Sequence, residues 1–241
     1  MRVSPTPCFI LHQRLYKETS LLLDVFSREH GRISLIAKGV RNNRKKSMAL
    51  YQPYRSLNVS WSGKGDLQTL TGIESNGLSI VLNPDAVMAA FYLNELIIRL
   101  LHKHEPSPSL FDAYYKALTR LSHGEITAIS LRYFEKHLLK ILGYGLVLDR
   151  DVNTDEPLLA DEHYHYTLDR GPSLIKPDNI STIRITGAAL LALDNENLNE
   201  ESNLEEIKHL MRSTLATYLG DKPLASRELY QSYLANKSAV E

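Results

Sequence analysis

The feature that most constrains the fold is a change of hydrophobic period at Asn83-Pro84. Before this point, apolar residues come in short runs or alternate with polar ones, which predicts β-strands. After it, they recur at every third or fourth position, which predicts helices. Asn can cap a helix and Pro suits its first position, so we place a helix start here. The chain is therefore expected to be α+β, with strands in residues 1–80 and helices in residues 81–241.

The first 80 residues contain five short strand-like segments. They lie at residues 8–12, 21–26, 33–35, 57–61 and 67–73. A Ser-Gly-Lys-Gly-Asp turn at 62–66 separates the last two segments. Five short strands in this length favour a small closed barrel, and the OB-fold is the commonest ligand-binding version. We therefore expect residues 1–80 to form an OB-fold domain.

Residues 81–241 are expected to form an α-helical domain with one irregular insertion. Apolar stripes at helical spacing run through 84–101, 108–121 and 125–142, resume near Thr186, and return from about Asn203 to Gly220. Residues 146–185 are mostly polar and contain prolines, and only residues 164–168 resemble a strand. We assign these residues to the irregular insertion.

The formal net charge of zero hides an asymmetry along the chain. Residues 1–79 have 12 Lys and Arg against 5 Asp and Glu, whereas residues 80–241 have 16 against 23. Between Glu29 and Asp66 there are eight basic residues and no acidic ones. Charge divided by region suggests different partners for the two halves. The basic half has the composition of a site for a polyanion such as nucleic acid.

The candidate phosphate contacts are the basic side chains of the first domain. Their densest run is KGVRNNRKK at 38–46, where Gly39, Asn42 and Asn43 allow a loop to bend. Such side chains bind phosphates regardless of base sequence. The alternative is a solvated surface loop. The complete candidate set is Arg14, Lys17, Arg32, Lys38, Arg41, Arg44, Lys45, Lys46, Arg55 and Lys64.

Four aromatic residues of this domain could stack on unpaired bases, namely Tyr16, Tyr51, Tyr54 and Trp61. Alternate positions in a barrel usually belong to its core. We therefore expect only one or two of the four to be exposed.

Metal-site signals are weak. His163 and His165 share one face of a predicted strand, but a solvent-facing pair is the simpler interpretation because a closed zinc site needs four ligands. Residues 149–160 begin like a calcium loop, yet they lack its glycine at Thr154 and its glutamate at Ala160. We expect no bound metal.

Catalytic motifs and targeting signals are also missing from the sequence. Cys8, the single cysteine, lies in an apolar strand pattern that suggests an inert buried thiol and no internal disulfide. There is no phosphate-binding loop and no nucleophile elbow. The chain contains no apolar run of about 18 residues and no amino-terminal signal peptide. We expect a cytoplasmic binding protein without a cofactor, a catalytic residue or a membrane partner.

Several motifs resemble those of the RecO family of recombination mediators. In the first domain they are YKETS (16–20), DVFS (24–27), HGR (30–32) and AKGVR (37–41). In the second they are YLNEL (92–96), RYFE (132–135), LGYG (142–145), GDKPL (220–224) and SREL (226–229). Their order and spacing extend the resemblance over the whole chain.

This resemblance implies a protein of DNA repair and recombination. Members of the family bind single- and double-stranded DNA, anneal complementary strands and, with RecR, help to load RecA onto DNA coated by single-stranded DNA-binding protein. Two alternatives remain. One is a metal-dependent nucleic-acid-processing enzyme whose basic OB-fold holds substrate, and the other is a helical scaffold whose basic loop is incidental.

The resemblance also implies a site for the acidic, Phe-terminated tail of single-stranded DNA-binding protein. Arg132, in the RYFE motif, is the first candidate for a carboxylate anchor, and Lys208 and Arg212 could assist from one helix face. The alternative for Arg132 is an intramolecular salt bridge. Many family members have four zinc-binding cysteines after the LGYG motif, whereas residues 147–161 contain none, which predicts a zinc-free member.

Overall fold

The computed structural model describes residues 2–40, 48–77, 80–178, 180–199 and 203–238. The chain divides into two compact units. Unit 1 contains Met1–His123 and Pro223–Glu241, and unit 2 contains Gly124–Lys222. We describe each unit by itself.

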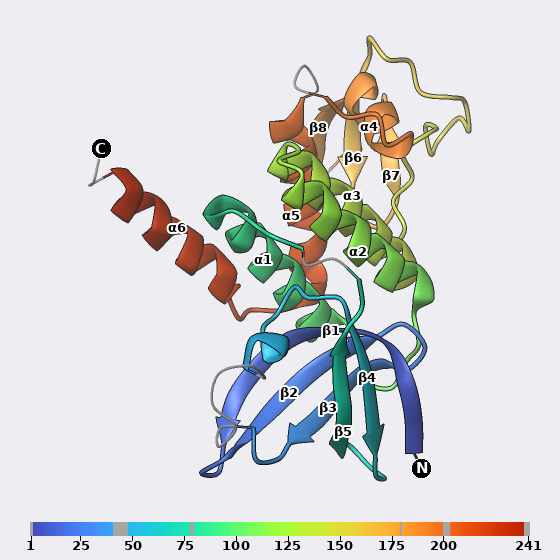
Figure 1. The fold of residues 1–241 in the computed structure, drawn as a ribbon. Coiled ribbons are helices and arrows are strands. Elements are labelled where there is room, and N and C mark those ends of the chain that lie inside the picture. Colours follow the sequence, from blue (N-terminus) through green and yellow to red (C-terminus); the bar gives the residue numbers. More distant parts are fainter. Residues whose placement is uncertain (1, 41–47, 78–79, 179, 200–202, 239–241) are drawn as a thin grey trace. The chain divides into compact units, whose positions relative to one another are not determined.

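Unit 1 begins with a closed five-stranded barrel in the order β1-β2-β3-β5-β4 (Figure 1). Neighbouring strands pair in antiparallel fashion, except β3 and β5, which are parallel. This is the predicted OB-like barrel, and the prediction is confirmed. The strands are β1 (Arg2–Tyr16), β2 (Ser20–Ser27), β3 (Gly31–Ala37), β4 (Leu57–Ser62) and β5 (Leu67–Ser75), and a short 3-10 helix, η1 (Met48–Tyr51), precedes β4.

Strand register defines the two ends of the barrel. Tyr16 pairs with Ser20 across the β1–β2 turn, and Leu21 pairs with Ala37. The end of β1, the start of β2 and the end of β3 therefore lie together, at what we call the hairpin end.

Strand β4 pairs with the first half of β1, from Arg2 to Cys8. Leu57 pairs with both Cys8 and Ser75, so the start of β4 and the end of β5 meet beside the middle of β1, away from the hairpin end. Arg2 pairs with Ser62, which places the β4–β5 turn and the start of β1 at the opposite end. Loops that are distant in sequence thus share one end of the barrel.

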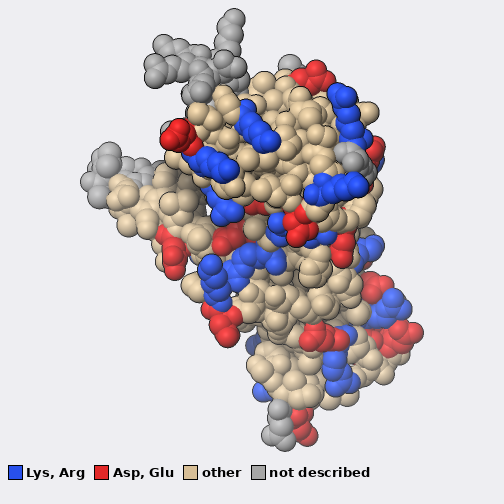
Figure 2. Space-filling model, turned by 90° about the horizontal axis from the view of Figure 1, so that it is seen from below, with Lys and Arg blue, Asp and Glu red and all other residues tan. Residues whose placement is uncertain are grey.

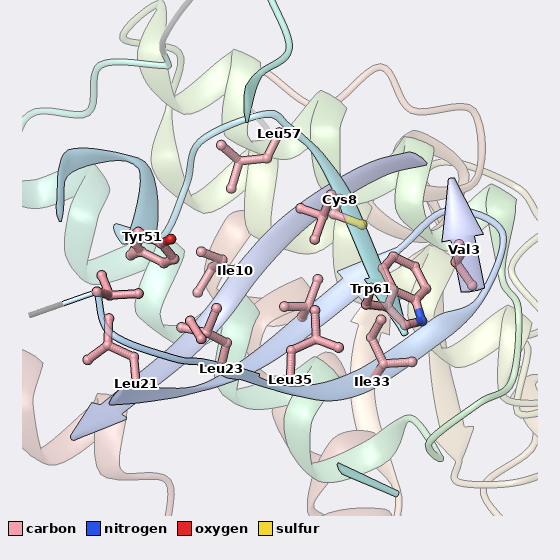
Figure 3. Packing of buried hydrophobic residues seen from close by; sticks show 14 residues of the cluster. Val3, Cys8, Ile10, Leu21, Leu23, Ile33, Leu35, Tyr51, Leu57 and Trp61 are labelled. Atoms are coloured by element: carbon pink, nitrogen blue, oxygen red, sulfur yellow. The ribbon is translucent and has the colours of Figure 1, made fainter. Parts of the chain in front are cut away.

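The barrel interior is a single apolar cluster (Figure 3). Burial alternates along β4, where Leu57, Val59 and Trp61 point inward. Strand β2 is buried along almost all of its length, because both of its faces are covered. Labelled members of the cluster are Val3, Cys8, Ile10, Leu21, Leu23, Ile33, Leu35, Tyr51, Leu57 and Trp61.

Three helices complete unit 1, namely α1 (Pro84–Leu100), α2 (Pro108–Ser122) and α6 (Ala225–Ser238). The predicted helix start at Pro84 is confirmed, and the Asn83 side chain accepts a hydrogen bond from the Ala86 N–H at 2.8 Å. Phe9 and Phe26, on the outer face of the barrel, pack against Phe111 of α2 with ring centroids 5.2 and 5.5 Å away. Helix α2 thereby covers the second face of β1 and β2.

A buried polar contact joins these elements at Asn94. Its amide nitrogen donates to the Leu11 carbonyl of β1 at 2.7 Å, and its amide oxygen accepts from the Tyr114 hydroxyl of α2 at 2.5 Å.

A second close contact involves Gly31, whose φ is +67°. Its backbone lies so close to Glu105 that a Cβ at this position would be 2.0 Å from the Glu105 carbonyl oxygen. The segment after α1 is therefore held against the β2–β3 turn.

Helix α6 was not predicted, because its apolar residues remain largely exposed. Leu229 and Tyr230 are each 45% exposed. The helix is anchored at its start by Glu95 of α1, whose carboxylate accepts hydrogen bonds from the Ala225 and Ser226 N–H groups at 2.9 Å and from the Ser226 hydroxyl at 2.6 Å. Two of the family-like motifs, YLNEL and SREL, meet in this contact.

Unit 2 combines helices with a small sheet of order β7-β6-β8 (Figure 1). Residues 146–185 hold more regular structure than the sequence predicted, because β7 and β8 are short and acquire their strand form by pairing with β6. The elements are α3 (Thr127–Ile141), β6 (His163–Thr167), β7 (Gly171–Ser173), β8 (Ile183–Thr186), α4 (Gly187–Asp194) and α5 (Leu204–Leu219).

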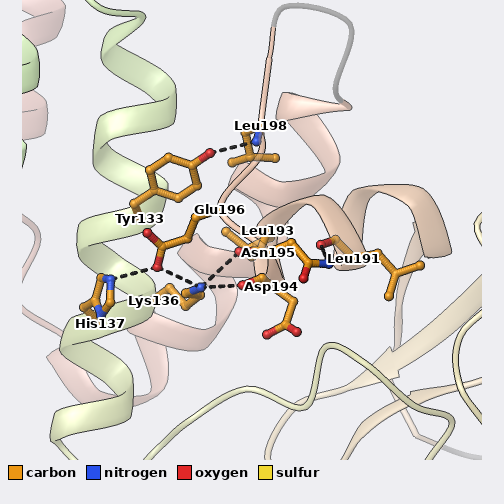
Figure 4. A network of polar contacts seen from close by, with 9 residues as sticks. All are labelled: Tyr133, Lys136, His137, Leu191, Leu193, Asp194, Asn195, Glu196 and Leu198. Atoms are coloured by element: carbon orange, nitrogen blue, oxygen red, sulfur yellow. Dashed lines mark hydrogen bonds and ion pairs between the residues drawn. The ribbon is translucent and has the colours of Figure 1, made fainter.

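The end of α4 is tied to α3 by a polar network (Figure 4). The Lys136 ammonium donates to the Leu193 and Asp194 carbonyl oxygens at 3.2 and 2.8 Å, where a cation complements the helix dipole. Glu196 lies 3.0 Å from this ammonium and 2.9 Å from His137 Nε2. The network fixes the connection that follows α4.

We predict that Glu95→Ala weakens the docking of α6 in a pH-dependent way. Burial raises the pKa of Glu95, but the hydrogen bonds from Ser226 and Ala225 outweigh it and hold the pKa below its usual value. The stabilisation is therefore present above the unfolded-state pKa of about 4.3 and is lost as the pH falls through the lower folded-state pKa.

Hydrogen exchange of the α6 amides measures this effect. At neutral pH the substitution should reduce the protection free energy of these amides by about 1.5 to 3 kcal/mol, the scale of hydrogen bonds to a charged group. Glu29→Ala, at an exposed turn position, is the control. Unchanged α6 protection in Glu95→Ala would contradict the prediction.

Candidate nucleic-acid interface

Three of the predicted phosphate contacts lie at the hairpin end of the barrel. Arg14 is near the end of β1, Lys17 is in the β1–β2 turn, and Lys38 follows β3. All three are exposed. Arg55 is half-buried and precedes β4, whose first residue pairs with Cys8 in the middle of β1, so it lies away from this end. The fold thus brings together cations from two separate parts of the sequence.

The densest part of the basic run falls outside the described residues. These positions are Arg41, Arg44, Lys45 and Lys46. Of the two residues that flank this segment, Val40 belongs to the barrel cluster and Met48 packs against it.

The remaining two candidates lie at the opposite end of the barrel. Lys64 is exposed in the β4–β5 turn. Arg32 is the second residue of β3 and is half-buried, and its guanidinium donates a hydrogen bond to the Ile98 carbonyl of α1. Burial lowers the pKa of Arg32. Because its guanidinium binds the backbone of α1, we expect Arg32 to stabilise unit 1.

Three of the four aromatic candidates are buried. Tyr51 and Trp61 belong to the barrel cluster, whereas the Tyr54 ring packs against Phe91 of α1, with centroids 6.0 Å apart. Burial raises the pKa of Tyr54.

Tyr16 is half-buried at the hairpin end, and the Lys17 ammonium lies 5.6 Å from its ring centroid. The neighbouring Leu15 is 68% exposed. Of the four aromatic candidates, only Tyr16 is not buried, and Leu15 adds apolar surface beside it.

The surface charge is mixed rather than uniformly basic. Figure 2 shows Lys and Arg side chains interspersed with acidic ones on the face in view. Unit 1 has 18 Lys and Arg against 11 Asp and Glu, whereas unit 2 has 10 against 17. The basic excess therefore belongs to the unit that contains the barrel.

Comparison with protein families decides the relationship. Residues 1–77 match the model described as "Recombination protein O N terminal", and residues 82–228 match "Recombination protein O C terminal". The chain belongs to the RecO family.

Relatives named "DNA repair protein RecO" match it over nearly their whole length. The protein from Nitrosococcus oceani is 43% identical, with 100% of this chain and 99% of the relative covered. The protein from Coxiella burnetii strain RSA 331 is 44% identical, with 95% and 98% covered. The protein from Methylococcus capsulatus is 41% identical, with 96% and 94% covered. The RecO resemblance of the sequence motifs is confirmed.

The three predicted tail-binding residues of this RecO family member are all in unit 2. Arg132 is buried and forms an ion pair with Glu135 at 2.8 Å, which is the intramolecular alternative weighed for this residue. Lys208 pairs with Glu205 at 2.8 Å, and Arg212 is exposed. The pKa of Glu205 is lowered by Lys208 first and then by Arg212 and Arg132. The three cations therefore act on a common region of α3 and α5.

The insertion of unit 2 is held by the buried carboxylate of Asp151. Asp151 accepts hydrogen bonds from the Asn153 and Leu174 N–H groups, both at 2.8 Å. His163 is exposed, and His165 Nδ1 lies 3.3 Å from the Thr182 hydroxyl.

The described part of the chain has neither a cluster of metal ligands nor a membrane-spanning helix. No group of three or more His, Cys, Asp and Glu side chains there could hold a metal ion. None of the helices described is long and apolar enough to cross a membrane.

We predict that Arg32→Met lowers the free energy of unfolding by about 1.5 to 3 kcal/mol, because it removes a charge-assisted hydrogen bond to the Ile98 carbonyl. DNA affinity and its salt dependence should stay close to wild type. Urea unfolding and salt titration of DNA binding measure the two effects, with Lys64→Met as the exposed control. A stable Arg32→Met protein with a reduced salt slope would instead place Arg32 in the DNA interface.

Proposed function

We propose that this chain binds single- and double-stranded DNA, anneals complementary strands and, with RecR, helps to load RecA onto DNA coated by single-stranded DNA-binding protein. It performs this work in the cytoplasm by binding alone, without catalysing a reaction. Membership of the RecO family supports the general role. The observation that carries the DNA-binding part is the gathering of Arg14, Lys17 and Lys38 at one end of an OB-like barrel.

Electrostatics explains how such a barrel promotes annealing. Two strands repel each other through their phosphates, and a cluster of Lys and Arg neutralises that charge while it releases counterions. Tyr16 and Leu15 at the same end offer stacking and apolar contact to bases of any sequence. The basic run at 41–46 extends the same set of cations in the sequence. Holding two strands together in this way needs no reaction chemistry.

We predict that the triple variant Arg14→Ala, Lys17→Ala, Lys38→Ala weakens DNA binding and flattens its salt dependence. Each phosphate contact on a single strand contributes about −0.7 to the slope of log K against log salt, so the slope should fall by up to about 2.1. Replacing Arg41, Arg44, Lys45 and Lys46 with Ala should remove up to about 2.8. Fluorescence anisotropy with a short oligonucleotide at several salt concentrations measures both slopes.

A matched triple variant at the opposite end of the barrel separates a local site from net charge. Arg2, Lys64 and Lys103 are exposed there, and replacing them with Ala removes the same number of charges. Circular dichroism checks folding in each variant. Equal losses of slope for the two triple variants would refute a DNA site at the hairpin end.

We further propose that unit 2 binds the acidic tail of single-stranded DNA-binding protein through Arg132, Lys208 and Arg212. Replacing Arg132 alone is a poor test, because removing one member of a buried ion pair costs about 3 to 5 kcal/mol of stability. The exposed Arg212 and the partly exposed Lys208 can be replaced without that cost.

We predict that Lys208→Ala with Arg212→Ala weakens binding of an acidic, Phe-terminated peptide by roughly tenfold or more, since a charge-assisted contact contributes about 1.5 to 3 kcal/mol. Binding to bare DNA should change little. Lys176→Ala, an exposed substitution in the same unit, is the control, and calorimetry measures peptide affinity. Unchanged peptide affinity in the double variant would exclude this site.

A further inference from the structure

The β1–β2 hairpin presents an apolar side chain at the cationic end of the barrel. Leu15 of β1 is 68% exposed. It pairs with Leu21 of β2, and residues directly opposite each other in an antiparallel pair point to the same face of the sheet. Leu21 is 2% exposed and belongs to the barrel cluster (Figure 3). Leu15 therefore lies on the core-facing side of its strand, yet its side chain reaches solvent.

Strand pairing explains this exposure. Strand β4 pairs with β1 only as far as Cys8, so among the described strands β2 alone pairs with the second half of β1. On the same face, Gln13 is half-buried and Leu15 is exposed, so burial decreases toward the end of the hairpin. The pairing of Tyr16 with Ser20 closes the hairpin just beyond this point. Leu15 is thus held in place by a strand ladder while its side chain stays uncovered.

The three exposed cations of the hairpin end surround this side chain. Arg14 and Lys17 lie one and two positions from Leu15 in the sequence. Lys38 follows β3, which is two strands away from β1 in the barrel. Neighbouring strands are about 4.8 Å apart, so β1 and β3 are separated by about 10 Å. A strand of DNA whose phosphates bind these cations therefore passes within reach of Leu15.

An apolar side chain distinguishes unpaired from paired DNA, whereas a cation does not. In a single strand, the face of an unstacked base is apolar and open to contact, and covering it together with Leu15 removes apolar surface from water. In a duplex, each base face is covered by its stacked neighbours, and Leu15 would have to unstack a step to reach one. Phosphates are accessible in both forms.

We propose that Leu15 makes the barrel bind unpaired strands more tightly than duplex DNA, by contacting the face of one unstacked base. The inference rests on the proposed DNA-binding function at the same end of the barrel and adds to it a selectivity for the state of the strand. When two bound strands pair, the contact with Leu15 is lost. The duplex product is then held by its phosphates alone and is released more readily than the single strands.

The experiment uses the full chain and three labelled DNA ligands of equal length. They are single-stranded oligothymidine, a single strand of abasic tetrahydrofuran residues, and a duplex. The abasic strand keeps the phosphates and has no bases, so it isolates the phosphate contacts. Fluorescence anisotropy at several salt concentrations gives the affinity and the salt slope for each ligand.

Leu15→Ser should weaken binding to oligothymidine by about threefold to tenfold, the scale expected for covering part of one leucine side chain. Affinity for the abasic strand and for the duplex should not change, because neither offers a base face. The salt slope should also stay at its wild-type value, since no charge is removed. Leu15→Met should keep the wild-type affinity for oligothymidine because it keeps an apolar side chain.

A matched control lies at the opposite end of the barrel. Leu67, the first residue of β5, is 44% exposed, and Leu67→Ser should leave all three affinities unchanged. Circular dichroism checks the folding of each variant, and Leu15→Ala takes the place of Leu15→Ser if the serine variant does not fold.

Three results would overturn the proposal. They are unchanged affinity of Leu15→Ser for oligothymidine, an equal loss of affinity for the abasic strand or the duplex, and the same loss in Leu67→Ser. In each case the barrel function stands if replacing Arg14, Lys17 and Lys38 still lowers the salt slope. If the wild type binds none of the three ligands, both proposals fail.

Discussion

The side chain of Asn94 connects the three layers of unit 1. It donates to the Leu11 carbonyl of β1 and accepts from Tyr114 of α2, while it belongs to α1. A buried amide is costly unless it is hydrogen-bonded, so these contacts favour one placement of the helix pair on the barrel. Phe9 and Phe26 are then covered by α2, which closes the outer face of β1 and β2. The side of the barrel is occupied, and the exposed cations of the hairpin end remain available to DNA.

Charge is separated between the two compact units. The unit with the barrel has the basic excess, and unit 2 has the acidic excess. In unit 2, cations occur in local pairs, such as Arg132 with Glu135 and Lys208 with Glu205. Cations compensated in this way contribute little to the binding of an extended polyanion. The division agrees with the proposed DNA site on the barrel and the proposed tail site on unit 2.

Sequence patterns predicted the barrel and the main helices because those elements bury one regular face. The change of period at Asn83-Pro84 coincides with the start of α1. Helix α6 escaped detection because Leu229 and Tyr230 are exposed and its attachment is polar, through Glu95. Strand β7 has three residues, which is too short for a period to be visible, and it exists through pairing with β6.

The sequence by itself determined the family, the five-stranded barrel, the helical remainder and the basic character of the first part, because local periodicity, motifs and charge are properties of the chain. Only the tertiary structure decided which cations share a surface. It placed Arg14, Lys17 and Lys38 together. It also directed the Arg32 guanidinium to the Ile98 carbonyl and buried Tyr51 and Trp61 in the barrel. Strand register and barrel closure determine which side chains become neighbours, and both depend on contacts between residues far apart in sequence.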